Sequence, residues 1–151
     1  MANQVLTNPL GAFGRTTGNE VNFQMVVPFE AAAAITAGDL VAVAATVNTD
    51  TTVTVETLDV SDALPELVLG VAKNTAAAGA VVEVVVFGYA VCNIGSTSPA
   101  MGNIVIIGAS DGVAGVLAPA VAGTITGDNF GIYLGTEIGS TNQAAIWFSK
   151  F

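Results

Sequence analysis

The residue types that most often carry chemistry in proteins are scarce in this sequence. It has no histidine, which removes the most common general base and metal ligand. Its one cysteine, Cys92, lies in an apolar run without a partner for a disulfide or a thiolate zinc site, and we interpret it as a buried small hydrophobic residue. No GxxxxGK phosphate loop occurs, and the glycine-rich stretch at 108–115 lacks a lysine. The sequence therefore predicts a protein that is not an enzyme and has no catalytic residue and no cofactor.

Carboxylates are the remaining candidates for chemistry. Asp59, Asp62 and Glu66 lie within LDVSDALPE, with a spacing that differs from that of an EF-hand loop. A glycosidase would need two carboxylates across a cleft, which spacing alone does not define. We interpret the stretch as a solvated acidic loop and predict no metal site, the alternative being a weak divalent-cation site at a subunit junction.

The aromatic residues gather near the C-terminal end of the chain. In the stretch AAIWFSKF, Trp147 and Phe148 point to opposite faces if the stretch is a strand. One of them then belongs to the core, and the other lies at an interface or in solvent. A platform on which a sugar stacks is an alternative interpretation, although aromatic residues are also common in plain protein interfaces.

The charge balance excludes several classes of partner. Twelve acidic residues against three basic ones give a net charge of −9. Nucleic acids and anionic membrane surfaces attract clustered Lys and Arg, which are missing here. The apolar run at 80–91 is interrupted by Glu83 and Gly88 and is too short for a helical membrane span. The N-terminal stretch also lacks a basic start followed by an apolar run, so we expect no signal peptide, no membrane partner and no nucleic-acid partner.

Period-two alternation and regular turn signals predict strands along most of the chain. Only EAAAAI at 30–35 invites a helix, and it is too short to support more than one turn. We predict an all-β fold, a small β-barrel or β-sandwich domain over residues 23–151 with an extended N-terminal arm over residues 1–22. The predicted strands are VNFQMVVPFE, DLVAVAATV, TTVTVETLDV, ELVLGVA, AVVEVVVFGYAV, NIVIIGA, GVAGVL, NFGIYLGTEI and QAAIWFSKF.

Two recurring sequence patterns support the β interpretation. A glycine followed by a short apolar run recurs in AGDLVAV at 37–43, AGAVVEV at 78–84, MGNIVII at 101–107 and TGDNFGI at 126–132. A glycine with positive φ is what a tight turn before a strand needs. The similar stretches LVLGVA and IYLGTE are each followed by a further strand, which predicts two hairpins built by similar rules.

Candidate interface residues come from the arm, the valine-rich strand and the C-terminal strand. In regular alternation Val81, Glu83, Val85 and Phe87 share one face of their strand, and the valines between them share the other. Both faces are apolar, so one needs the domain core and the other a second sheet or a partner chain. The arm either stays disordered or orders against a neighbour. The predicted interface residues are Leu6, Leu10, Phe13, Arg15, Val81, Val85, Phe87 and Trp147.

The stretches AITAGDLVAV, LVLGVAKNTAAAGAVVEVVVFGYAV and GIYLGTEI with AAIWFSKF resemble the capsid decoration (cement) proteins of tailed bacteriophages. The resemblance covers residues 30–151 and departs from the family pattern at YLGTEIG. It implies a small β-barrel or β-sandwich, usually trimeric, that binds the major capsid protein on the outside of the expanded head. The chain would then be made in the host cytoplasm and stabilise the shell as a homotrimer.

Two other functions are compatible with the residues alone. One is a carbohydrate-binding or adhesive β-domain on a phage or cell surface, for which Trp147 would be the anchor. The other is a pilin-like or surface-layer subunit, which the richness in Ala, Val, Gly and Thr also fits.

Overall fold

The computed structural model describes residues 13–15, 21–44, 53–61, 68–95, 98–117, 129–139 and 141–150. Within these ranges the chain forms β-strands and no helix, so the predicted all-β fold is confirmed. None of the described residues belongs to a helix with the length and apolar character that crossing a bilayer requires. The strands are β1 (Phe13–Arg15), β2 (Val21–Ala31), β3 (Leu40–Val43), β4 (Thr54–Thr57), β5 (Val68–Ala72), β6 (Val81–Asn93), β7 (Ile104–Ile107), β8 (Ala114–Leu117), β9 (Gly131–Glu137) and β10 (Gln143–Phe148).

The strands β2 to β10 each lie within one of the runs that the sequence predicts as strands, give or take a residue or two at the ends. Strand β1 was not predicted. The stretch EAAAAI forms no helical turn: Ala31 ends β2, and Ile35 makes a single bridge with Ala76. Both Ala31 and Ile35 are buried, so the alanine-rich stretch serves the core and its local helix preference is overridden.

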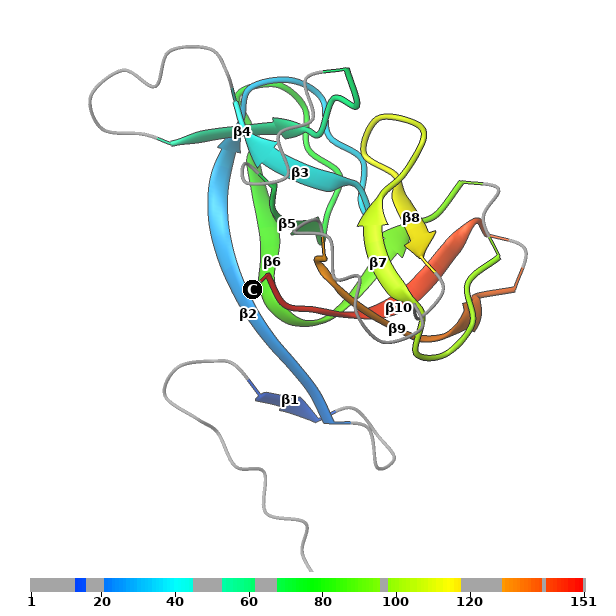
Figure 1. Cartoon of the computed structure of the whole chain (residues 1–151). Helices are drawn as coiled ribbons and strands as arrows, with labels where there is room; N and C mark the ends of the chain where they lie inside the picture. Colours follow the sequence, from blue (N-terminus) through cyan, green and yellow to red (C-terminus); the bar gives the residue numbers. More distant parts are fainter. Residues whose placement is uncertain are drawn as a thin grey trace, which may run out of the picture.

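Hydrogen bonding closes part of the sheet into a ring (Figure 1). Around the ring run β2, β4, β3, β5 and β6, and β6 pairs back with β2. The β2–β4 pair is parallel, and the other pairs are antiparallel. From β6 the sheet continues through β10, β9, β7 and β8. Strand β1 pairs with the N-terminal end of β2, which Figure 1 shows extending away from the ring.

Glycine turns start several strands, as the sequence predicts. Gly38, Gly79 and Gly102 have φ values of 92°, 76° and 84°, and β3, β6 and β7 each begin two residues later. Gly112, with φ of 67°, precedes β8 in the same way. The fourth predicted turn, around residue 127, lies outside the described residues. The two predicted hairpins are also confirmed, because β5 pairs antiparallel with β6 and β9 with β10.

Strand β6 belongs to two hydrophobic cores and changes its buried face part-way along. Val82 and Val84 belong to a smaller core with residues of β2, β3, β4 and β5. Val85, Ala90 and Cys92 belong to a larger core with residues of β7, β8, β9 and β10. The strand therefore joins the ring to the rest of the sheet.

A β-bulge accompanies this change. Met25 of β2 lies opposite Phe87, whereas its neighbour Val26 lies opposite Val85, so β6 has one extra residue at Val86. Since neighbouring residues of β2 point to opposite faces, Val85 and Phe87 do too. The prediction that Val85 and Phe87 share a face is therefore wrong.

Candidate functional site

Apolar side chains cover one outward-facing region of the sheet. Met25 of β2 lies opposite Phe87 of β6, and Trp147 of β10 lies opposite Ile132 of β9. Cross-strand partners share a face of a sheet, and Phe23, two residues from Met25, shares the face of Met25. We call this region the aromatic face, made of Phe23, Met25, Phe87, Ile132 and Trp147.

Three rings at the centre of the aromatic face contact one another. The rings of Phe23 and Trp147 are stacked, with centroids 6.2 Å apart and planes 20° apart. Phe87 meets each of them edge-on, with centroid distances of 5.7 Å and interplanar angles of 81°. Such offset and edge-to-face geometries are the favourable ones for aromatic pairs, so the cluster is a defined structure.

Much of the aromatic face is open to solvent. Met25 is 51% exposed, Phe87 36% and Ile132 45%, while Phe23 and Trp147 are half-buried. On the opposite side of β10, Phe148 is fully buried, so one of the two neighbouring aromatic residues is core and the other is at the surface, as predicted. A contiguous exposed apolar patch that includes Trp, Phe and Met and no charge is typical of a protein interface.

The antiparallel pairing of β2 with β6 sets the position of Phe23. The pairing of β2 with β6 begins at Gln24, which lies opposite Gly88. Gly88 has φ of 99°, and a Cβ there would collide with the backbone oxygen of Phe23. Only glycine allows the two backbones to approach this closely. Before Gln24, β2 pairs with β1 alone among the described strands.

Beside the aromatic face lies an open cavity of about 250 Å³. Its lining includes the polar side chains of Gln24, Lys73, Tyr89 and Gln143 between valines and alanines. Gln143 is held by Asn93, to whose Oδ1 it donates a hydrogen bond of 2.9 Å. Among the described residues that line the cavity there is no carboxylate, cysteine, serine or threonine.

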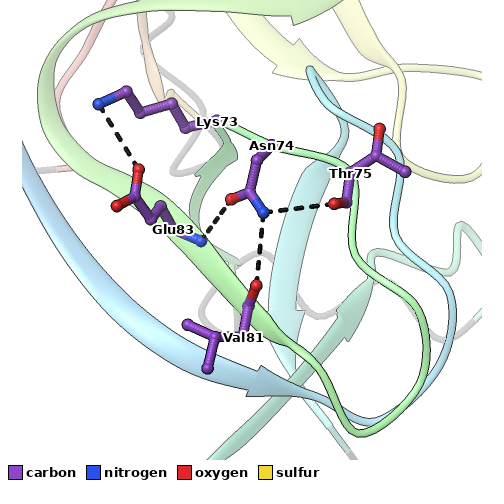
Figure 2. Close-up of polar contacts among 5 residues, drawn as sticks. All are labelled: Lys73, Asn74, Thr75, Val81 and Glu83. Carbon is purple, nitrogen blue, oxygen red and sulfur yellow. Dashed lines mark hydrogen bonds and ion pairs between the residues drawn. The ribbon is translucent and has the colours of Figure 1, made fainter.

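The loop between β5 and β6 carries the lysine of this cavity (Figure 2). Lys73 forms an ion pair of 3.6 Å with Glu83, and both side chains are about half exposed. Asn74 accepts a 2.7 Å hydrogen bond from the backbone N–H of Glu83 and donates one of 3.3 Å to the carbonyl oxygen of Val81. Figure 2 shows how Asn74 thereby fixes the loop against the start of β6.

Two side chains that can act as nucleophiles, Cys92 and Tyr133, are buried. Burial raises the pKa of Cys92 from 9.0 to about 12, and its Sγ lies 3.6 Å from the carbonyl oxygen of Ala144. Burial also raises the pKa of Tyr133, whose hydroxyl donates a 2.9 Å hydrogen bond to the carbonyl oxygen of Gly115. Both groups are therefore protonated at neutral pH and are poor nucleophiles.

The predicted acidic loop is only partly described, because Asp62 and Glu66 lie outside the described residues. Asp59 accepts hydrogen bonds of 2.7 Å from both the backbone N–H and the hydroxyl of Ser61. Over the described ranges, no three metal-ligating side chains come close enough together to hold an ion.

The structure brings together two of the predicted interface residues, Phe87 and Trp147. Val81 is 64% exposed at the first residue of β6, and Val85 is buried in the larger core, which leaves it no free surface for a partner. Phe13 and Arg15 lie in β1, whereas residues 1–12, with Leu6 and Leu10, fall outside the described residues.

Three members of the aromatic face, Phe23, Met25 and Ile132, are not among the interface residues that the sequence predicts. Phe23 and Met25 alternate with polar neighbours, which places them on one face of β2. That alternation does not tell which face is exposed, because exposure depends on how β2 pairs with β6. Ile132 carried no signal of its own, and only its place opposite Trp147 identifies it.

Comparison with solved structures relates the fold to that of a bacteriophage protein. No protein-family model matches the sequence, and no curated protein matches it in sequence. The chain is similar to the crystal structure of the head fiber gp8.5 N base of bacteriophage phi29, with a TM-score of 0.58 and 15% sequence identity. The match covers 85% of this chain and 96% of that chain, so the two share their fold.

Proposed function

We propose that this chain is a structural protein of a bacteriophage virion, which binds the outer surface of the capsid and stabilises the shell as a homotrimer. The observation that carries the proposal is the fold, which matches the N base of a phage head fiber over nearly the whole of both chains. The likeness of residues 30–151 to capsid decoration proteins supports it from the sequence alone. The coat contacts are assigned to the N-terminal arm.

We also propose that the function is binding and not catalysis. The sequence has no histidine, and burial keeps Cys92 and Tyr133 protonated. The surface feature that stands out is an uncharged cluster of aromatic and aliphatic side chains, which suits binding. The net charge of −9 is unfavourable for contact with packaged DNA and suits a position outside the shell.

The proposed mechanism is mass action. A protein that binds the assembled, expanded shell and not its separated subunits stabilises the shell by its binding free energy. Attachment through three arms at once raises the overall affinity well above that of one arm, because each later arm binds at a high effective concentration.

Co-sedimentation tests this proposal. Expanded capsids of the phage that encodes the chain, prepared without it, are mixed with the purified protein and pelleted. The full chain is expected to pellet with the shells at a fixed, saturable ratio, and a variant lacking residues 1–15 is expected to stay in the supernatant. A full chain that stays in the supernatant contradicts capsid binding, and undiminished binding of the shortened chain removes the arm from the mechanism.

A carbohydrate-binding or adhesive β-domain is the second candidate, and the surface position of Trp147 is the observation in its favour. The ring of Trp147 stacks on Phe23, which takes up part of the surface that a sugar would need. The chain has a single tryptophan, so a glycan that stacks there would change its fluorescence. We expect no change on titration with the surface glycans of the phage's host.

A further inference from the structure

We infer that the open cavity beside the aromatic face binds an aliphatic carboxylate, supplied by an acidic side chain or by the C-terminus of a peptide. The polar side chains that line the cavity are Gln24, Lys73, Tyr89 and Gln143. The site goes beyond the proposed function, because the coat contacts are assigned to the N-terminal arm and the cavity does not depend on capsid binding.

The pairing of the sheet brings these four side chains together from four different elements. Gln24 of β2 lies opposite the residue that precedes Tyr89 of β6. Gln143 begins β10, which pairs with the same strand β6. Lys73 directly follows β5, and its backbone N–H donates a 2.8 Å hydrogen bond to the carbonyl oxygen of Glu83 in β6. The backbone of the site is therefore in place before a ligand arrives, which lowers the entropic cost of binding.

A hydrogen-bond network sets the orientation of the Gln143 amide. Asn93 Nδ2 donates both of its N–H groups, to the carbonyl oxygen of Ala37 at 3.2 Å and to Oδ1 of Asp39 at 2.8 Å. Asn93 Oδ1 is an acceptor and receives a hydrogen bond of 2.9 Å from Gln143 Nε2. This contact uses one N–H of the Gln143 amide and leaves the second one for another acceptor.

Further donors at the cavity are free to meet a ligand. Within the ranges that the structure describes, the side-chain amide of Gln24 and the hydroxyl of Tyr89 form no hydrogen bond. Over the same ranges, every side-chain nitrogen or oxygen atom that is fully buried has a partner. The unpaired atoms of Gln24, Tyr89 and Gln143 are therefore open to solvent, and a ligand can reach them.

The charge and the donors of the lining favour a carboxylate. Lys73 is the one charged side chain among the described lining residues, although acidic residues outnumber basic ones by twelve to three in the sequence. An ionised carboxyl group only accepts hydrogen bonds and has room for about four, and those from a cation are the stronger kind. The ammonium, the two amides and the hydroxyl of the cavity supply donors of this kind and number.

The size and the apolar walls of the cavity define the rest of the ligand. Its volume of about 250 Å³ is smaller than the roughly 300–1,000 Å³ of sites for drug-sized ligands. The cavity is thus suited to one side chain or one chain terminus. Val71, Val85 and Ala37 lie between the polar groups and provide an apolar surface for the aliphatic part that carries the carboxyl group.

Glu83 is the internal competitor for Lys73 (Figure 2). The two side chains form an ion pair of 3.6 Å and are both about half exposed. Such exposed pairs contribute little to stability, so a bound carboxylate can replace Glu83 as the partner of Lys73. Repulsion from the more distant acidic residues is screened beyond about 8 Å at physiological ionic strength.

NMR titration of the isotope-labelled full chain tests the inference with three small probes. N-acetylglutamic acid α-amide presents a side-chain carboxylate, and N-acetylalanine presents a carboxylate like that of a peptide C-terminus. N-acetylglutamine α-amide is the neutral counterpart of the first probe. We expect saturable shifts of the signals of Gln24, Tyr89 and Gln143 with at least one of the carboxylates and no shifts with the neutral amide. The carboxylate that binds more tightly identifies the source.

Three variants separate the local charge from the charge of the whole chain. Lys73→Gln is expected to weaken binding about fivefold, the factor that corresponds to a good exposed ion pair. Glu83→Gln is expected to tighten binding, because it removes the competing carboxylate and keeps the backbone N–H that Asn74 accepts. Lys150→Gln removes the same charge from a lysine outside the cavity lining and is expected to leave the affinity unchanged. The NMR spectrum of each variant checks that it is folded.

Three results would overturn the inference. The first is that the signals of the cavity residues stay in place with both carboxylates. The second is that the neutral amide binds as tightly as its carboxylate counterpart, and the third is that folded Lys73→Gln keeps the affinity of the unmodified chain. None of these results depends on whether the chain pellets with capsids, so this site and the proposed function are tested separately.

Discussion

Gly131 shows how one residue holds the aromatic face in place. It has φ of 143° and lies opposite Phe148 at the start of β9. A Cβ at this position would collide with the backbone oxygen of Trp147. The close approach of β9 to β10 beneath Trp147 therefore depends on the missing side chain.

Substitution of this glycine gives a stability prediction. Gly131→Ala is expected to lower the free energy of unfolding by about 2–4 kcal/mol, because it adds both a strained φ and a backbone collision. Gly135→Ala is the control, since a Cβ on Gly135 in the same strand meets nothing within 4 Å. Urea denaturation measures both. Equal losses of unfolding free energy in the two variants would show that the backbone collision at Gly131 is not the cause of the destabilisation.

The buried thiol and phenol predict how stability depends on pH. The folded protein holds the pKa values of Cys92 and Tyr133 above their ordinary values of 9.0 and 10.0. Above pH 9 the unfolded chain therefore binds fewer protons than the folded one, and the free energy of unfolding falls as the pH rises. The contribution is fully present below pH 9 and is lost as the pH rises through the folded pKa values.

Denaturation midpoints between pH 8 and pH 11 measure this effect. In Cys92→Ala only the contribution of Tyr133 remains, so the decline is expected to be shallower and to begin nearer pH 10. An unmodified chain and a Cys92→Ala variant with the same pH profile would mean that the thiol ionises equally well in both states.

At the scale of elements, the β5–β6 hairpin contains two kinds of polar contact that are expected to contribute differently to the free energy of unfolding. Asn74→Ala is expected to cost about 1–2 kcal/mol of unfolding free energy, because the backbone N–H of Glu83 loses its partner. Lys73→Ala removes a half-exposed ion pair of 3.6 Å and is expected to cost less than about 0.5 kcal/mol. Thermal denaturation at low and high salt compares the two variants. A larger loss of unfolding free energy in Lys73→Ala than in Asn74→Ala would contradict this prediction.

Strand β6 also shows which parts of an element the sequence predicts. The apolar run and the glycine turn at Gly79 predict where the strand begins and that it is largely buried. The bulge at Val86 has no such signal, because the residues around it are all β-branched or aromatic. Without the bulge, simple alternation puts Phe87 beside Val85, and the aromatic face cannot be assembled from the sequence.

At the scale of the whole molecule, local sequence patterns predict the all-β class of the fold. They do not predict that β2, β4, β3, β5 and β6 close into a ring. Alternation and turn residues predict the strands β2 to β10 one by one. The pairing of β2 with both β4 and β6 joins residues far apart in the sequence and depends on packing that local patterns do not encode. For the same reason the sequence predicts Trp147 and Phe87 as interface residues separately, and it does not predict the direct contact of their rings.

We propose that this chain stabilises a phage capsid by binding its outer surface. The most direct measurement is the temperature at which expanded capsids come apart, recorded by calorimetry with and without the purified chain. We predict a rise that continues to grow, roughly with the logarithm of the free chain concentration, after the sites are full, because a protein that binds only the assembled shell stabilises it by mass action. A disassembly temperature that is the same with and without the chain, at concentrations far above those that fill the sites, would contradict this proposal.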